Sequence, residues 1–281
     1  MAKIIALDIG GTNTRVALIN EKYEIESVKI SPTVVGNTDL FLANVKKTIL
    51  EAIPSKAFKD VKALAMGVPG RVRYDGFIYA LPNIHIDNVP LASYLTKEFH
   101  LPSYVINDAE VAALAEANIG PFKKAKSLYF VTISTGVGGA LTIQGELRNS
   151  SYEAGHTMTA YHGEVHEFEH MASGVGLRRL ADMNGLEITD AREFFELVKN
   201  KNPLALSVYQ DWISLVADWL EMIYNAFTPE VFTLTGGVMK SAPIFFEDLR
   251  RAAPHCHLEL CGCGQEAGLI GAAVLGFQRT K

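Results

Sequence analysis

The sequence of 281 residues has few cysteines, little charge imbalance and no long apolar run. Its three cysteines all fall between positions 256 and 263, so they form no disulfide framework and a reducing compartment is expected. The formal net charge of -5 provides no basic surface for nucleic acid or for an anionic membrane. The longest strongly apolar run, residues 267–277, is shorter than a membrane span requires. These absences exclude a secreted disulfide scaffold, a membrane protein and a nucleic-acid-binding protein.

The first residues, MAKIIALDIGG, do not fit a secretory signal, because they contain one lysine and reach an aspartate directly after the apolar run. A cytoplasmic location is therefore expected. The composition, 48% hydrophobic and 20% charged, is that of an ordinary globular protein. A chain of this length suits one large domain or two lobes.

Strand-like segments joined by a glycine turn, followed by alternating helices and strands, occur twice along the chain. This repetition predicts an α/β fold of two related lobes with a cleft between them. We expect an N-terminal lobe over 1–107 and a larger C-terminal lobe over 108–267, with the last helix, about 268–281, packing back on the first lobe. Within the second lobe, helical segments are expected over roughly 172–200 and 203–227.

The first glycine turn follows Asp8, which closes an apolar strand. The backbone N–H groups of Gly10 and Gly11 can approach an anion without interference from a β-carbon, and Thr12 adds a hydroxyl donor. A tight β-hairpin turn alone would also explain the two glycines. An acid at the end of a buried strand needs a partner such as hydrated Mg²⁺, so phosphate binding is the favoured interpretation.

Two more glycine turns follow strands in the second half of the chain. STGVGG, residues 134–139, places Thr135 and Gly136 in a second strand–turn–strand unit, and LTGGV places Gly236 and Gly237 after a third strand. Two matched units could hold one polyphosphate, and the third turn would allow close backbone approach to a flat ring.

Asn107 and Asp108 stand at the end of a predicted strand and the start of a predicted helix. Either residue type commonly caps a helix there. In a phosphate-binding protein, however, a carboxylate at this position can accept the proton of an attacking hydroxyl.

The ordered set of motifs resembles the ROK family of sugar kinases, within the actin/hexokinase/Hsp70-like ATPase fold with ribonuclease H-like lobes. The resemblance covers nearly the whole chain. The matching motifs are DIGGT, GVPG, Pro82-Asn83, IND, TGVGG, the E-x-x-H of Glu153 and His156, the E-x-x-x-S-G at 169–174, TGG and AGLIGAA.

The resemblance implies a role for each matching residue. Asp8 would lie near Mg²⁺, through water, and near the phosphates; Asp108 would be the catalytic base. The residues implied to bind nucleotide are Asp8, Gly10, Gly11, Thr12, Thr135, Gly136, Gly236 and Gly237. The residues implied to bind sugar are Asn107, Glu153, His156, Glu169, Gly70 and Asn83.

The stretch from 153 to 174 holds four histidines and four glutamates but lacks the cysteines that give most of the family a structural zinc site. Ala160, His162 and Glu167 stand where those cysteines would be, so no structural zinc is expected. A substitute metal held by His156, His162, His166 and Glu167 stays an open alternative. The cysteines at 256, 261 and 263 are expected to pack as small hydrophobic residues.

The resemblance therefore implies an ATP- and Mg²⁺-dependent carbohydrate kinase that transfers the γ-phosphoryl group to a hydroxyl, the 6-OH of a hexose such as glucose. N-acetylmannosamine or another amino sugar is an alternative substrate. A sugar-sensing regulator without catalytic activity is an alternative of another class, but its DNA-binding extension would have no room before the strand that begins at residue 3. A homodimer is expected, and the sequence does not locate its interface.

Overall fold

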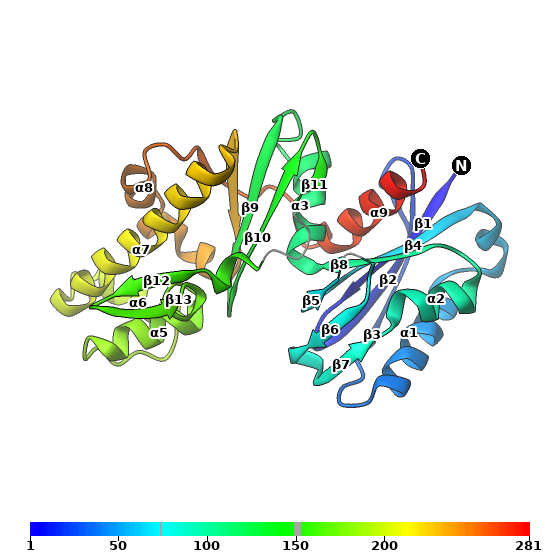
Figure 1. The fold of residues 1–281 in the computed structure, drawn as a ribbon, viewed down its shortest axis with the longest axis horizontal. Coiled ribbons are helices and arrows are strands. Elements are labelled where there is room, and N and C mark those ends of the chain that lie inside the picture. Colours follow the sequence, from blue (N-terminus) through cyan, green and yellow to red (C-terminus); the bar gives the residue numbers. More distant parts are fainter. Residues whose placement is uncertain (74, 149–152) are drawn as a thin grey trace. The chain divides into compact units, whose positions relative to one another are not determined.

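The computed structural model describes residues 1–73, 75–148 and 153–281 (Figure 1). Contacts between Cα atoms divide the chain into two compact units. The first contains residues 1–124, 142–151 and 262–281, and the second contains residues 125–141 and 152–261.

The first unit is built on a five-stranded sheet of order β3-β2-β1-β4-β8. Its strands are β1 (Lys3–Ile9), β2 (Asn13–Asn20), β3 (Ile25–Pro32), β4 (Val61–Val68) and β8 (Ser103–Asn107). The first three are antiparallel neighbours, whereas β1, β4 and β8 run parallel. The carboxyl ends of the three parallel strands therefore meet at one edge, where α/β sheets bind ligands.

Helices cover both faces of this sheet (Figure 1). The helices α1 (Thr38–Ala52) and α2 (Leu91–Phe99) share a core with alternate residues of β1, namely Ile5, Leu7 and Ile9. On the opposite face, α3 (Asp108–Ile119) and α9 (Ala267–Arg279) pack on Ile4 and Ala6. The two-residue alternation of a strand thus supplies two separate apolar cores.

This unit also contains a smaller three-stranded sheet. Its strands are β5 (Arg71–Val72), β6 (Ile78–Leu81) and β7 (Ile86–Val89). A 3₁₀ turn at Ser55–Asp60 precedes β4, and another at Pro82–Ile84 lies within the smaller sheet's sequence.

The second sheet repeats the strand order of the first, as β11-β10-β9-β14-β15. Its strands are β9 (Ser127–Ile133), β10 (Val137–Ile143), β11 (Glu146–Arg148), β14 (Val231–Thr235) and β15 (Leu258–Leu260). Here β9, β14 and β15 are the parallel strands. The predicted pair of related α/β folds is confirmed by this shared order.

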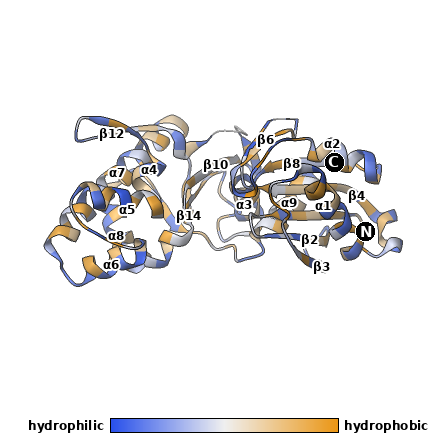
Figure 2. Cartoon of the chain, turned by 90° about the horizontal axis from the view of Figure 1, so that it is seen from below, coloured by the Kyte–Doolittle hydropathy of each residue, from blue (hydrophilic) through white to orange (hydrophobic). Residues whose placement is uncertain are grey.

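Helices supply most of the core of the second unit, and in Figure 2 they carry hydrophobic and hydrophilic residues side by side, as amphipathic helices do. They are α4 (Glu169–Ala172), α5 (Gly174–Met183), α6 (Ala191–Lys199), α7 (Pro203–Phe227) and α8 (Ala242–Ala252), with 3₁₀ turns at Ala154–His156 and Gly237–Ser241. None of the helices within the described residues has the length and apolarity to cross a bilayer.

Two parts of the second unit differ from the sequence-based expectation. The helical segment expected over 172–200 is interrupted, because Gly185 adopts a left-handed φ of 75° and α5 ends before it. The stretch from 158 to 167, whose residues follow neither the strand nor the helix period, is a hairpin of β12 (Met158–Tyr161) and β13 (Glu164–Glu167). Its turn places His162 and Gly163 at φ values of 49° and 82°, as a tight hairpin turn requires.

The contact-defined units place α3 in the first unit, whereas we expected the second lobe to begin at residue 108. The physical reason is the close packing of α3 on α9. A β-carbon on Gly271 of α9 would lie 1.7 Å from the backbone oxygen of Val111 on α3. Only glycine allows the two helices to approach this closely.

Replacing Gly271 with alanine is therefore expected to destabilise the protein, by about 1–3 kcal/mol, the usual cost of overpacking. Relative to glycine, alanine in a helix favours folding by about 1 kcal/mol. That gain does not offset the clash, because the helix backbones of α3 and α9 cannot move aside as a flexible side chain can. Denaturant unfolding measures the change. Gly264→Ala is the control, because a β-carbon there would meet no atom within 4 Å. Equal stability of the two variants would contradict the packing argument.

Candidate functional site

The carboxyl edge of the first sheet gathers most of the predicted residues of the first unit. Asp8 lies near the end of β1, Gly70 follows β4, and Asn107 ends β8. The side-chain amide of Asn107 donates a hydrogen bond of 3.0 Å to the carbonyl of Gly70. Parallel strands therefore bring together residues that lie far apart in the sequence.

The DIGGT turn connects β1 to β2 at the same edge. The Gly10 N–H donates to the carbonyl of Asn13 at 2.8 Å, and the hydroxyl of Thr33 donates to the carbonyl of Gly10 at 2.7 Å. A β-carbon on Gly11 would lie 3.0 Å from the β-carbon of Asn83, so the turn and the predicted sugar residue Asn83 are in close contact. The turn is thus held by hydrogen bonds and leaves little room for a side chain at Gly11.

Asp8 has a cationic partner that the sequence analysis missed. Arg15 lies directly opposite Asp8 in the β1–β2 register, with 3.5 Å between Nη1 and Oδ2, and its other nitrogen contacts Glu266 at 2.5 Å. Burial raises the pKa of Asp8, and Arg15 opposes that shift. The hairpin pairing around a short turn was the signal that could have identified Arg15. Asp8 therefore offers carboxylate oxygens, which Mg²⁺ prefers, beside the turn.

Asn107 and Asp108 form the junction of β8 and α3. Asn107 is the N-cap of α3, and its side-chain oxygen accepts the Ala109 N–H at 2.8 Å. Glu110 completes a capping box by accepting the Asn107 N–H at 3.0 Å. Asp108 is thus the first residue of the helix, and its carboxylate also accepts the Ala109 N–H at 2.8 Å.

The second sheet has its glycine turns at the corresponding edge. Thr135 and Gly136 connect β9 to β10, and Gly236 and Gly237 follow β14. Gly236 has a φ of 105°, and a β-carbon there would lie 2.2 Å from the carbonyl oxygen of Ile133, so only glycine fits.

Glu169 connects the second glycine turn to the predicted sugar residues of this unit. Its carboxylate accepts the Val137 N–H at 3.1 Å, and a β-carbon on Gly136 would lie 2.6 Å from the same oxygen, Oε2. A predicted phosphate turn and a predicted sugar-binding side chain are therefore in direct contact.

His156 is held by a carboxylate that the sequence analysis did not assign to it. Its Nδ1 lies 2.7 Å from Oε2 of Glu167, and both side chains are exposed. The ligand atoms of His156, Glu167 and Glu169 all lie within 4.8 Å of one another and could hold a cation. The set lacks any thiolate, and Ala160, on the neighbouring β12, offers no ligand atom. It therefore does not fit the three-cysteine zinc site expected of the family.

The Glu167 carboxylate raises the pKa of His156 above its ordinary value, and His156 lowers the pKa of Glu167. The pair therefore stabilises the fold fully between the ordinary glutamate and histidine pKa values. This contribution is lost as the pH rises through the raised pKa of His156, or falls through the lowered pKa of Glu167. Because both groups are exposed, the effect on stability is small.

Glu167→Gln is expected to lower the pKa of His156, which an NMR titration of the imidazole would measure. Glu164→Gln, on the same hairpin strand, is the control and should leave the titration of His156 unchanged. An unaltered pKa in Glu167→Gln would show that the two side chains are not paired in solution.

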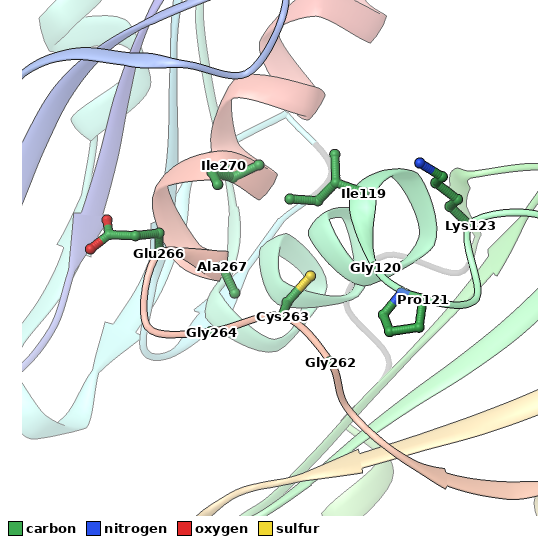
Figure 3. Close-up of a pocket in the computed structure, with 10 residues that line it drawn as sticks. All are labelled: Ile119, Gly120, Pro121, Lys123, Gly262, Cys263, Gly264, Glu266, Ala267 and Ile270. Atoms are coloured by element: carbon green, nitrogen blue, oxygen red, sulfur yellow. The ribbon is translucent and has the colours of Figure 1, made fainter.

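A cavity of about 520 Å³ lies in the first unit, between the end of α3, residues 262–264 and the start of α9. Figure 3 shows Ile119 and Ile270 near Cys263, whose sulfur points toward α3. Burial and a hydrogen bond with Glu116 raise the pKa of Cys263 to about 12. Cys256 is buried as expected, but Cys261 and Cys263 are only half-buried. None of the predicted site residues lines this cavity.

Two five-stranded sheets with the same strand order, each with a glycine turn at its carboxyl edge, define the actin/hexokinase-like ATPase fold. The chain belongs to the ROK family, whose family model matches residues 4–279. The residue roles inferred from that resemblance stay predictions.

Sequence similarity to named sugar kinases extends over almost the whole chain. The chain is 26% identical to a glucokinase of Halalkalibacterium halodurans, over 99% of this chain and 96% of the relative. It is 28% identical to an N-acetylmannosamine kinase of Salmonella newport, over 96% of this chain and 97% of the relative. The crystal structure of a ROK hexokinase from Thermus thermophilus superimposes with a TM-score of 0.83 at 26% identity, covering 99% of this chain and 98% of that one. The class that these relatives share is a carbohydrate kinase.

Proposed function

We propose that this protein is an ATP-dependent sugar kinase that transfers the γ-phosphoryl group of ATP to the 6-hydroxyl of a hexose such as glucose. The observation that carries the proposal is the position of Asp108. It directly follows the helix-capping Asn107 at the end of β8, on the sheet edge that also carries the DIGGT turn. A carboxylate is thereby placed on the ligand-binding edge, while the capping box of α3 is formed by its neighbours Asn107 and Glu110.

In this proposal each predicted residue acts through ordinary hydrogen bonding. The amide, carboxylate and imidazole groups of Asn107, Glu153, His156 and Glu169 bind sugar hydroxyls as paired donors and acceptors. The residues that hold the nucleotide phosphates are those of the first two glycine turns. Mg²⁺, when bound beside Asp8, neutralises phosphate charge.

A second candidate substrate is N-acetylmannosamine or another amino sugar. The similarity to an N-acetylmannosamine kinase, at 28% identity, is of the same order as the similarity to a glucokinase, at 26%. Family membership alone does not choose between the two sugars.

The test is the release of ADP from Mg-ATP by the purified protein, in the presence of a panel of hexoses and acylated amino sugars. Sugar-dependent ADP release with glucose as the best substrate supports the main proposal. A clear preference for N-acetylmannosamine selects the second candidate. Sugar binding by calorimetry without any ADP release would overturn the kinase proposal in favour of a regulator.

We also propose that the fold needs no structural zinc, since Ala160 and the His156–Glu167 pair replace the expected thiolate site. Prolonged treatment with a chelator such as EDTA is then expected to leave the thermal unfolding temperature unchanged, because structural zinc contributes directly to folding free energy. Elemental analysis provides the independent check. One zinc per chain after purification without added metal would contradict the proposal.

A homodimer in the cytoplasm completes the proposal, as the family resemblance implies. Light scattering at micromolar concentration distinguishes a dimer from a monomer.

A further inference from the structure

A second cavity, of about 340 Å³, lies wholly within the second unit. Its walls come from the β9–β10 turn, the first turns of α5 and α6, and the residues that follow β14. Thr135 and Gly237, two of the residues predicted to bind nucleotide, are among those that line it. One residue from each of the two predicted nucleotide-binding turns of this unit therefore faces the same concave space.

Two arginines to which the proposed function assigns no role also line this cavity. Arg178 belongs to α5 and Arg192 to α6, and both are exposed. Within the described ranges, neither guanidinium makes an ion pair or side-chain hydrogen bond, whereas Arg15 and Arg250 each pair with a carboxylate. Two guanidinium groups that face a cavity without an anionic partner are suited to an anionic ligand.

The lining also contains one carboxylate, that of Asp190. It is the N-cap of α6 and accepts the Glu193 N–H at 2.9 Å. This local bond gives Asp190 a structural function at the helix start. The Asp190 charge therefore does not account for the two arginines.

The position of Arg178 on its helix places it near the predicted phosphate turn. The Gly174 N–H donates to the carbonyl of Ser134 at 2.6 Å, which fixes the start of α5 against this turn. Arg178 lies four residues after Gly174 and therefore on the same face of the helix. Arg178 therefore lines the cavity about one helical turn along α5 from the contact with Ser134.

Arg192 lies where this cavity adjoins another one. The neighbouring cavity, of about 470 Å³, is also lined by Arg192 and Gly237, together with Lys240 on the 3₁₀ turn after β14. Arg192 thus lines both cavities together with Gly237, which belongs to the turn expected to lie by the adenosine. The apolar side chains of Val175 and Val238 complete the wall of the 340 Å³ cavity.

We propose that Arg178 binds the phosphates of the nucleotide and that Arg192 lies against the face of its base. The inference rests on the proposed function and adds two residues that set the specificity for a nucleotide as phosphoryl donor. A guanidinium binds phosphate oxygens through two parallel N–H groups, and it also stacks on flat aromatic rings.

The test compares Arg178→Met and Arg192→Met with Arg179→Met. Arg179 is the matched control, because it is an exposed arginine on the same helix that lines neither cavity. Calorimetry measures the affinity of each protein for ADP and for inorganic tripolyphosphate, which has phosphates but no base. Circular dichroism checks that each variant is folded.

Arg178→Met is expected to lower the affinity for both ligands by about tenfold or more, since charge-assisted hydrogen bonds to phosphate are lost. Arg192→Met is expected to lower the affinity for ADP by about three- to thirtyfold, which corresponds to the energy of a cation–π contact. The affinity for tripolyphosphate should not change. Arg179→Met should match the wild type with both ligands.

Unchanged binding of both ligands by Arg178→Met would overturn its role. An equal loss of ADP and tripolyphosphate affinity in Arg192→Met would overturn the contact with the base. The proposed function is judged separately, by sugar-dependent ADP release from the wild type. If the wild type phosphorylates sugar and both arginine variants bind ADP normally, only this inference fails. If the variants lose ADP affinity as expected but the wild type phosphorylates no sugar, only the proposed function fails.

Discussion

Replacing Asp108 with asparagine is expected to lower kcat by about 10²–10⁴, or roughly 3–5 kcal/mol in activation free energy. In phosphoryl transfer the protein mainly positions the reactants and neutralises charge, but the attacking hydroxyl must still lose its proton. Asparagine keeps the shape of aspartate and cannot accept that proton. The Michaelis constant for the sugar should change little, because hydrogen-bonding capacity at the position is retained.

The structure makes this variant a clean test. The capping box of Asn107 and Glu110 stays in place, and an asparagine at 108 keeps the Oδ1 that accepts the Ala109 N–H. Asn107→Ala is the contrasting variant. It should cost about 1 kcal/mol of stability through the lost cap, and it should weaken sugar binding. If kcat of Asp108→Asn stays within a few-fold of the wild type while sugar affinity collapses, Asp108 anchors the sugar and another group is the base.

Valine at either phosphate turn is expected to lower kcat/KM for ATP by about 10²-fold, the effect of displacing reacting groups by about 1 Å. At Gly11 the new β-carbon would press on Asn83, at 3.0 Å. In our proposal, the rest of the side chain would enter the space where the phosphates bind. Steady-state kinetics with ATP as the varied substrate measure the loss.

The Gly136→Val variant should behave differently from Gly11→Val. Its β-carbon would lie 2.6 Å from Oε2 of Glu169, so Glu169 must move and its bond to the Val137 N–H is lost. We therefore expect the Michaelis constant for the sugar to rise together with that for ATP. Gly264→Ala is again the control, because its β-carbon meets nothing within 4 Å. Normal nucleotide affinity in both valine variants would remove the assignment of these turns to phosphate.

Local patterns in the sequence were sufficient for most of the elements and for the glycine turns. The period of apolar residues predicted α7 at 203–227, and the repeated strand–glycine–strand units predicted two related α/β folds. These features depend on neighbours along the chain, whose spacing is visible in the sequence. The break between α5 and α6 depends on one left-handed glycine at 185, and a glycine inside a helical pattern does not by itself show that the helix ends.

Tertiary structure alone decided which side chains share a contact. His156 contacts Glu167 because of a hairpin that the residue pattern did not predict. Arg178 lines the cavity because the start of α5 is hydrogen-bonded to the β9–β10 turn. The contact between Gly136 and Glu169 joins positions 33 residues apart. Such contacts follow from the packing of whole elements, and a sequence motif records a residue type and its spacing but not the distant group that packing brings beside it. The sequence by itself therefore determined the fold class, the glycine turns and the candidate residues, whereas only the folded chain determined the partners of those residues.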